Sequence, residues 1–168
     1  MTKKKPTEET GTRALEALVA AGVPYRVVHY EHSPRAKTFG EEAIAQIDRA
    51  PGQMFKTLLV SCDEGAEFVV AVVPLDRHLS LKAIAKAAGY KSAEMASPTI
   101  AQRRTGYVVG GISPLGQMMR HRTFVDDTAL DYEIVLFSGG KRGLSVEVSP
   151  LDLIELTDAE LIDLKALD

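Results

Sequence analysis

Apolar positions recur at helical spacing directly after Thr12, near the start of the chain. This pattern predicts a helix from about Thr12 to Ala21, with Gly22 as its C-terminal stop. The run YRVVHY at 25–30 is β-branched and aromatic, which predicts a strand. We expect a short helix over about 40–47 before the next apolar run.

The middle of the chain carries the clearest hairpin pattern. MFKTLLVSC at 54–62 is followed by the polar turn DEGA and then by EFVVAVV at 67–73. Ser80 is placed to cap a helix that runs to Ala88, and Gly89 ends it. The pair Ser97-Pro98 predicts the start of another helix, which Gly106 closes.

The last third predicts more strands and a helical end. We expect a short apolar strand at 107–109 and a strand pair at 132–137 and 144–148, joined by the turn SGGKRG. Ser149-Pro150 begins a final helical region, and the T-x-x-E spacing of Thr157 and Glu160 predicts a second short helix there. Hairpins that alternate with helices indicate an α+β fold with a mixed, strongly curved sheet.

Composition supports one globular unit. The chain has 168 residues, of which 45% are hydrophobic and 26% charged, so we expect a flexible tail at 1–11 and a single domain at 12–168. The first ten residues lack the apolar stretch of a signal peptide, and no later apolar run reaches the roughly 18 residues of a membrane span. A cytoplasmic protein is expected. The one cysteine, Cys62, lies in an apolar run and is expected to be buried rather than reactive.

The charge is unevenly distributed. The net charge is −3, yet residues 77–122 carry eight basic side chains against one acid, Glu94, which gives +7. This stretch fits either a phosphate-binding face or an ordinary solvated helix surface. Residues 150–168 carry one lysine against six acids, which gives −5.

Lys56 is the most unusual position for a charged side chain. It lies within an apolar strand and, on a period of two, shares a face with Leu58, Val60 and Cys62. If it points into a cavity, its ammonium is partly desolvated and acts strongly on developing negative charge. If it lies on an edge strand, it keeps its head in water. Alternation leaves both readings open, because the face of Thr57 is also partly apolar.

Two glycine-rich segments allow close backbone approach. In TGYVVGGISPLG at 105–116, the amides of Gly110 and Gly111 can form an oxyanion hole, although a structural bend also accounts for a glycine pair. SGGKRG at 138–143 is typical of a hairpin turn with two exposed bases and lacks the spacing of a phosphate loop.

No conventional nucleophile, metal site or cofactor site is predicted. His29 and His32 are three residues apart in an extended segment and therefore point to opposite faces. His78 and His121 lie near basic residues and are expected at the surface. The chain also lacks the G-x-S-x-G elbow of a serine hydrolase.

Four segments together resemble one family. They are Tyr30-Glu31-His32, FKTLLV at 55–60, TGYVVGGISPLG at 105–116 and SGGKRGL at 138–144. In this order they resemble the YbaK family of Cys-tRNA(Pro) deacylases, relatives of the editing domain inserted in bacterial prolyl-tRNA synthetases. The resemblance covers roughly Thr12 to Asp158.

The resemblance implies a barrel-like mixed sheet with flanking helices and a pocket for the aminoacylated end of tRNA. It places the catalytic positions at Lys56, Gly110 and Gly111, and implies that the substrate's own thiol attacks its carbonyl. It also implies a set of substrate-binding residues: Tyr30, Phe39, Thr57, Ser113, Pro114, Ser138, Gly139, Gly140 and Arg142. Prolyl-tRNA synthetase is the implied protein partner.

The preferred amino acid is the least determined part of this interpretation. Related deacylases that remove alanine tend to carry asparagine after the lysine, whereas this chain has Thr57, which favours cysteine. The family often has lysines where this chain has Met118-Met119. The alternatives are a deacylase for Ala-tRNA(Pro) or another small mischarged residue, and a non-catalytic module that binds tRNA or a synthetase.

Overall fold

The computed structural model describes residues 11–31 and 39–167, with the side chains of 39–41 also outside the description. The tail predicted at 1–11 therefore lies, apart from Gly11, outside the described residues. In the described part of the chain, no helix is long and apolar enough to cross a membrane.

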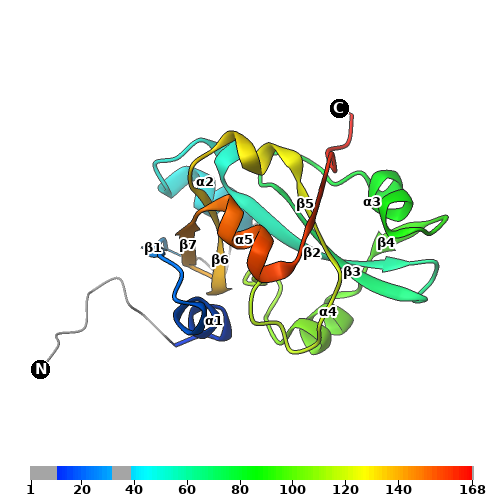
Figure 1. Cartoon of the computed structure of the whole chain (residues 1–168), viewed down its shortest axis with the longest axis horizontal. Helices are drawn as coiled ribbons and strands as arrows, with labels where there is room; N and C mark the ends of the chain where they lie inside the picture. The colour runs from blue at the N-terminus through cyan, green and yellow to red at the C-terminus, as the bar shows by residue number, and fades with distance from the viewer. Residues whose placement is uncertain (1–10, 32–38, 168) are drawn as a thin grey trace, which may run out of the picture.

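The described strands form two sheets (Figure 1). The smaller sheet is antiparallel and has the order β1-β7-β6, with bounds Arg26–His29, Leu144–Val148 and Val135–Lys141. The larger sheet has the order β4-β2-β3-β5-β8, with bounds Ala93–Met95, Phe55–Cys62, Glu67–Pro74, Thr123–Asp126 and Glu160–Ile162. It is mixed, because β2 is antiparallel to β3 and β4 while β5 is parallel to β3 and β8.

The expectation of a barrel-like sheet is wrong, whereas the α+β class is confirmed. Among the described residues, the two sheets are joined by backbone pairing only at an isolated bridge between Met54 and Leu136. Beyond this bridge β2 and β6 separate, and residues from both strands line a common cavity instead of forming a ladder. A barrel needs continuous pairing around its circumference, which this separation prevents.

Within residues 11–31 and 39–167, five α-helices accompany the sheets. Their bounds are α1 Arg13–Ala21, α2 Phe39–Gln46, α3 Leu81–Ala88, α4 Pro98–Thr105 and α5 Pro150–Thr157, and short 3-10 turns cover Pro51–Gln53 and Asp127–Asp131. Three helices begin as the sequence predicted: the hydroxyls of Thr12, Ser80 and Ser97 each accept a hydrogen bond from the backbone amide three residues later. The glycines that end these helices, at 22, 89 and 106, are left-handed.

Several local predictions were wrong. Residues 107–109 form no strand, because the chain turns there and Gly111 N–H donates to Val108 O. The second C-terminal helix is absent as well. Asp158 ends α5 in the left-handed conformation, and the following residues pair with β5 as strand β8. Strands β4, β5 and β8 were not predicted.

Two apolar clusters cover opposite faces of the β2–β3 hairpin. Phe55 and Leu59 belong to the cluster that lies toward α1 and the small sheet, whereas Val60 and Cys62 belong to the cluster under α3. Cys62 is fully buried, as predicted, and burial raises the pKa of its thiol. Because side chains alternate along a strand, Lys56 lies on the α3 face and Thr57 on the other.

Candidate active site

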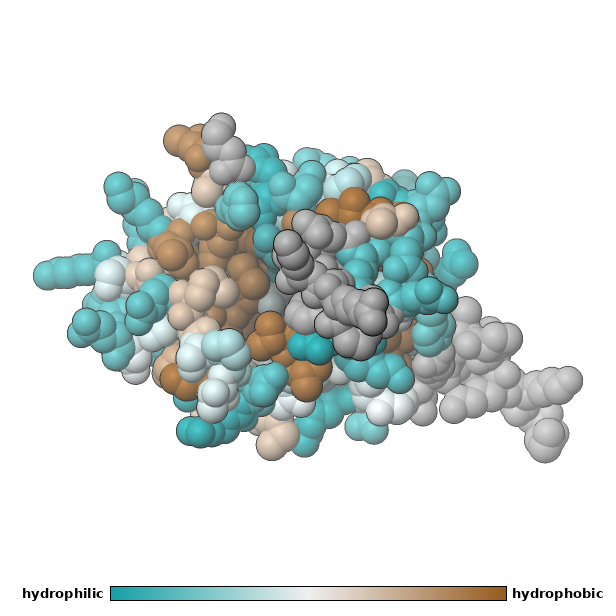
Figure 2. Space-filling view, turned by 180° about the vertical axis from the view of Figure 1, so that it is seen from behind, coloured by the Kyte–Doolittle hydropathy of each residue, from teal (hydrophilic) through white to brown (hydrophobic). Residues whose placement is uncertain are grey.

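A cavity of about 680 Å³ lies beside the first half of β2. Figure 2 shows one face of the molecule on which apolar residues gather around a hollow. Strand β4 pairs with β2 only from Val60 to Cys62, so the edge of β2 before Val60 is free to border this cavity. Its walls come from β2, β6, α2, α4 and the loop that contains Gly110 and Gly111, which we call the glycine loop. The lining residues include Tyr30, Ile44, Met54, Lys56, Thr57, Leu58, Leu75, His78, Met95, Pro98, Gly110, Leu136 and Ser138.

Lys56 lines this cavity and is half-buried. It lies opposite Val73 in the hairpin. Burial lowers the pKa of its ammonium, and the negative charge of Asp76 partly opposes that shift. A cation that has lost part of its water interacts more strongly with a developing negative charge than a fully solvated one does. The lysine is therefore placed to stabilise an anionic oxygen within the cavity.

Thr57 provides an unpartnered hydroxyl on the opposite face of β2 from Lys56. Its side chain is 7% exposed, and its Oγ1 is the one buried side-chain oxygen or nitrogen, among the described residues, that makes no hydrogen bond. Leaving a buried hydroxyl unpaired costs about 1–3 kcal/mol. Thr57 also borders the cavity.

The two glycines of the predicted pair differ in their position relative to the cavity. Gly110 lines the cavity and has a φ of 89°, which favours glycine. Gly111 does not line it, and its N–H donates to Val108 O at 2.9 Å within the turn. A side chain at Gly111 would place its Cβ 2.8 Å from Lys141 Cα. Glycine at 111 therefore allows the loop to pack against the β6–β7 turn.

Ser138 and Arg142 hold this glycine loop in place. Ser138 Oγ donates to Gly111 O at 2.9 Å and accepts from Gly140 N at 3.1 Å. Arg142 Nε donates to Val109 O at 2.8 Å. Ser138 also lines the cavity, whereas Arg142 is not part of the lining. These two side chains fix the backbone of Gly110 from β6 and from the turn after it.

The other predicted substrate-binding residues lie at varied distances from the cavity. Tyr30 lines it, and burial raises the pKa of its phenol. Ser113 and Pro114 are buried outside the lining, and Ser113 Oγ accepts from Leu115 N. Gly139 and Gly140 pack against neighbouring side chains outside the lining: a Cβ would lie 2.9 Å from Leu144 Cγ and from Thr12 Cβ, respectively. The side chain of Phe39 and the whole of His32 fall outside the described residues.

The two histidines that were expected at the surface have different environments. His78 is exposed as predicted, but it borders the cavity, which nothing in its sequence neighbourhood indicated. His121 is only 8% exposed, so the prediction of a surface group was wrong. It is buried because Gln117 and Arg104 hydrogen-bond to its two ring nitrogens.

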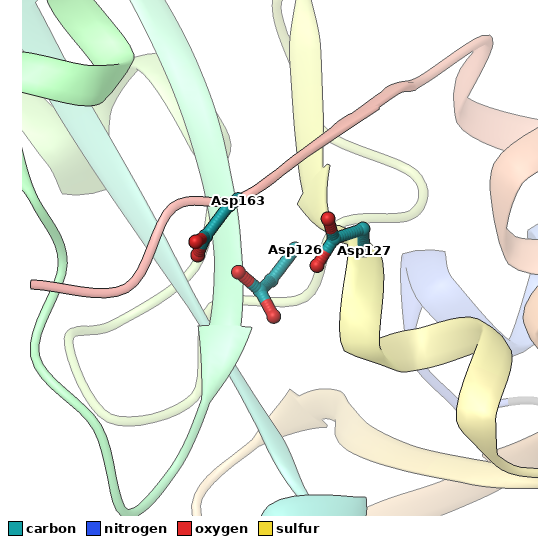
Figure 3. Close-up of side chains that lie close together, drawn as sticks. All are labelled: Asp126, Asp127 and Asp163. Carbon is teal, nitrogen blue, oxygen red and sulfur yellow. The ribbon is translucent and has the colours of Figure 1, made fainter.

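A cluster of three carboxylates, Asp126, Asp127 and Asp163, has a structural explanation (Figure 3). The ammonium of Lys165 lies among them, 3.1 Å from both oxygens of Asp126 and 2.8 Å from Asp163 Oδ1. Asp126 is fully buried and also accepts from Leu164 N. The lysine supplies the positive charge that these acids require, and the cluster ties the C-terminal segment to β5.

Comparisons with known proteins identify the family of this chain. The family model of the aminoacyl-tRNA editing domain matches residues 33–156. EbsC of Enterococcus faecalis, by name a candidate Cys-tRNA(Pro)/Cys-tRNA(Cys) deacylase, is 32% identical over 98% of both chains. The multifunctional Ser/Thr-tRNA deacylase ProXp-y of Escherichia coli is 25% identical over 98% of both chains.

A solved structure shares the whole fold. It belongs to a protein described as a candidate trans-editing enzyme for prolyl-tRNA synthetase, and it superposes with a TM-score of 0.81 at 25% identity, covering 98% of this chain and all of the other. The family model covers well over half of this chain, including the cavity lining of β2 and the glycine loop. The chain therefore belongs to the family of aminoacyl-tRNA editing domains.

Proposed function

We propose that this chain is an aminoacyl-tRNA deacylase that hydrolyses the ester of mischarged Cys-tRNA(Pro) in the cavity beside β2. One observation carries the assignment of the site. A partly desolvated lysine and an unpartnered buried threonine hydroxyl lie side by side in sequence on the wall of one apolar cavity. The 32% identity to EbsC over nearly the whole chain supports the reaction and the preference for cysteine.

Lys56 stabilises the negative charge that develops in the proposed mechanism. The carbonyl oxygen of the aminoacyl ester gains negative charge as the tetrahedral intermediate forms. An ammonium held about 3 Å from that oxygen stabilises the charge, and a single donor of this kind is worth about 10²–10³ in rate. The backbone of Gly110 borders the same cavity and is held by the bonds that Ser138 and Arg142 make to its neighbours.

The substrate supplies the nucleophile in this proposal. The cysteine thiol attacks its own ester carbon, a carbon–sulfur bond forms and the bond to the ribose oxygen breaks. The thiol proton leaves with that ribose oxygen, and water then opens the cyclic thioester to release cysteine. Ser138 is less suited to attack, because its hydroxyl donates its proton to Gly111 O. Positioning within the cavity provides the remaining acceleration.

The apolar walls account for the size of the amino acid that fits. Met54, Leu58 and Leu136 line the cavity, and its volume of about 680 Å³ lies within the range of small-ligand sites. A terminal adenosine and a small amino acid side chain would both fit within this volume. Thr57 Oγ1 is the polar group best placed to contact the substrate there.

A second substrate class is supported by one relative. The 25% identity to ProXp-y of Escherichia coli, a multifunctional Ser/Thr-tRNA deacylase, favours serine or threonine as alternative amino acids. Both carry a hydroxyl that can pair with Thr57 Oγ1. Alanine, which has no polar side-chain atom, offers this hydroxyl no partner.

A panel of aminoacyl-tRNAs tests the proposal. Cys-, Ala-, Ser- and Thr-tRNA(Pro) are incubated with the protein, with and without prolyl-tRNA synthetase, and loss of the ester is followed over time. We expect the fastest loss for Cys-tRNA(Pro) and a further increase when the synthetase is present. Ester loss no faster than in buffer for every substrate would contradict the deacylase assignment, and faster loss of Ser-tRNA(Pro) would replace cysteine as the preferred amino acid.

A further inference from the structure

A second hollow of about 840 Å³ lies at the far end of the β2–β3 hairpin from Lys56. We call it the arginine cleft, after the three arginines in its lining. Its walls consist of residues 65–68, Arg104, residues 120–123 and residues 157–160. None of these residues borders the cavity beside β2.

Arg104 is held in the arginine cleft without a neutralising acid. Its guanidinium lies over the ring of Phe68, 4.4 Å from the ring centre, and its Nε donates to His121 Nε2 at 3.2 Å. No carboxylate of the described residues forms an ion pair with it. Arg122 differs, because it makes two hydrogen bonds of 2.9 Å to the carboxylate of Glu67. Of these two arginines, Arg104 therefore has the positive charge that no carboxylate of the described residues neutralises.

The acceptor that holds Arg104 is a neutral imidazole. Burial, together with the charge of Arg104, lowers the pKa of His121 to about 4. Because Nε2 accepts from Arg104, Nδ1 carries the proton and donates to Gln117 Oε1, 2.8 Å away. Gln117 Nε2 in turn donates to Ser113 O at 3.0 Å. This chain of hydrogen bonds orients the guanidinium and leaves its full positive charge available to a ligand.

The arginine cleft lies on the face of the hairpin that carries Thr57, which is one of the two faces from which β2 lines the cavity. Phe68 is opposite Ser61 in the ladder, on the face that also carries Thr57, and helix α4 joins the two sites. Its residues Pro98 and Ala101 border the cavity, whereas Arg104 borders the cleft. Thr57 and Ser61 are four positions apart on β2, a distance of about 13 Å. At about 3.4 Å of rise per nucleotide, this corresponds to roughly four stacked nucleotides.

The opposite wall of the cleft narrows the choice of ligand. The carboxylates of Asp158 and Glu160 are exposed there, and their negative charge would repel a simple anion. A ribonucleotide carries an anionic phosphate for the arginines and a 2′-hydroxyl donor for the carboxylates. We propose that Arg104, assisted by the exposed Arg120, binds a backbone phosphate of the tRNA acceptor stem while the aminoacyl ester occupies the cavity. This inference rests on the proposed function.

Binding of an uncharged acceptor-stem RNA hairpin with a CCA end tests the inference separately from catalysis. The variant is Arg104→Gln, and the matched control is Arg103→Gln, a neighbouring arginine of α4 outside the cleft lining. We expect Arg104→Gln to weaken binding roughly tenfold. It should also reduce the slope of log Kd against log salt by about one. Arg103→Gln should change both quantities much less.

Three further comparisons keep the outcomes distinct. Arg104→Lys retains the charge but not the planar fork and should bind with intermediate affinity, which separates charge from folding if Arg104→Gln is unstable. A DNA hairpin of the same sequence lacks the 2′-hydroxyls and should bind more weakly than the RNA. A small ester, 3′-O-cysteinyl adenosine, is too short to reach the cleft and should be hydrolysed equally by wild type and Arg104→Gln.

Two results would overturn different parts of the account. Equal affinity and equal salt slope for Arg104→Gln and Arg103→Gln would remove the phosphate site from the arginine cleft. Failure of the wild type to hydrolyse either the small ester or Cys-tRNA(Pro) would instead contradict the proposed function, while the binding comparison would still report on Arg104.

Discussion

The two hollows on the β2–β3 hairpin differ in how their polar groups are partnered. In the cavity, Lys56 is partly desolvated and Thr57 Oγ1 has no hydrogen bond. In the arginine cleft, Arg104 and Arg122 are each held by neighbouring side chains. One polar group of the cavity therefore lacks a hydrogen-bond partner among the described residues, whereas the guanidinium groups of Arg104 and Arg122 are held in position by other side chains. This difference fits the roles that we propose, with the chemistry in the cavity and the binding of a substrate phosphate in the cleft.

The largest effect is expected at Lys56. Replacing it with methionine keeps an unbranched side chain one atom shorter and removes the charge, so deacylation of Cys-tRNA(Pro) should fall about 10²–10³-fold. The melting temperature should not fall, because a partly desolvated ammonium is replaced by an apolar group. The control is Lys82→Met on the exposed side of α3. Unchanged single-turnover rates for Lys56→Met would show that the lysine has no catalytic role.

The contribution of His121, in the arginine cleft, to the free energy of unfolding should depend on pH. The pKa of His121 is about 4 in the folded state, below its ordinary value of 6.5. The unfolded chain therefore takes up a proton first as the pH falls. The stability that the neutral ring provides is complete above about pH 6.5 and is lost as the pH drops toward 4, by about 3 kcal/mol.

The measurement is the free energy of unfolding of wild type and His121→Gln between pH 7 and pH 4. We expect the difference between the two proteins to shrink or reverse as the pH falls. His78→Gln, at an exposed histidine, should follow the wild-type pH dependence. A difference between wild type and His121→Gln that stays constant across this range would show that His121 is not a buried neutral base.

An intermediate effect is expected at Gly111. Alanine there would place a methyl group 2.8–2.9 Å from backbone atoms of Lys141 and Arg142. Since a backbone cannot yield cheaply, Gly111→Ala should lower the free energy of unfolding by about 1–3 kcal/mol and slow deacylation. Gly11→Ala, where no atom lies within 4 Å of the added methyl, is the control. Equal urea denaturation midpoints for both variants would contradict this close packing.

The smallest effect should come from Thr57. Thr57→Val removes a hydroxyl that has no partner, so stability should rise by about 1 kcal/mol while the rate of deacylation falls several-fold. The same change at Thr105 removes a hydroxyl that donates to Ala101 O and accepts from Tyr107 N. Thr105→Val should therefore be destabilising. A loss of stability in Thr57→Val would mean that this hydroxyl is bonded in the folded protein.

The sequence predicted best those elements whose determinants are local. The caps at Thr12, Ser80 and Ser97 and the hairpin turn after Cys62 each depend on a few adjacent residues. Strands β5 and β8 depend on parallel pairing between distant segments, which leaves no local pattern. Thr157 shows the limit of a short motif: its hydroxyl donates to Leu153 O inside α5 and caps no new helix.

The candidate site shows the same division. Lys56 was found because a charge in an apolar run is conspicuous, but alternation did not reveal whether it faced a cavity. The cavity depends on where β4 stops pairing with β2 and where β6 separates from it, which only the tertiary structure defines. The separate positions of Gly110 and Gly111, and the presence of His78 at the cavity, have the same origin.

The most direct test of the account is a crystal structure with a non-hydrolysable analogue, 3′-cysteinylamido-adenosine. The account predicts that the analogue occupies the cavity beside β2, with its carbonyl oxygen about 3 Å from Lys56 Nζ and Thr57 Oγ1 bonded to the ligand. Binding of the analogue in the arginine cleft, or in the cavity with its carbonyl directed away from Lys56, would contradict the account.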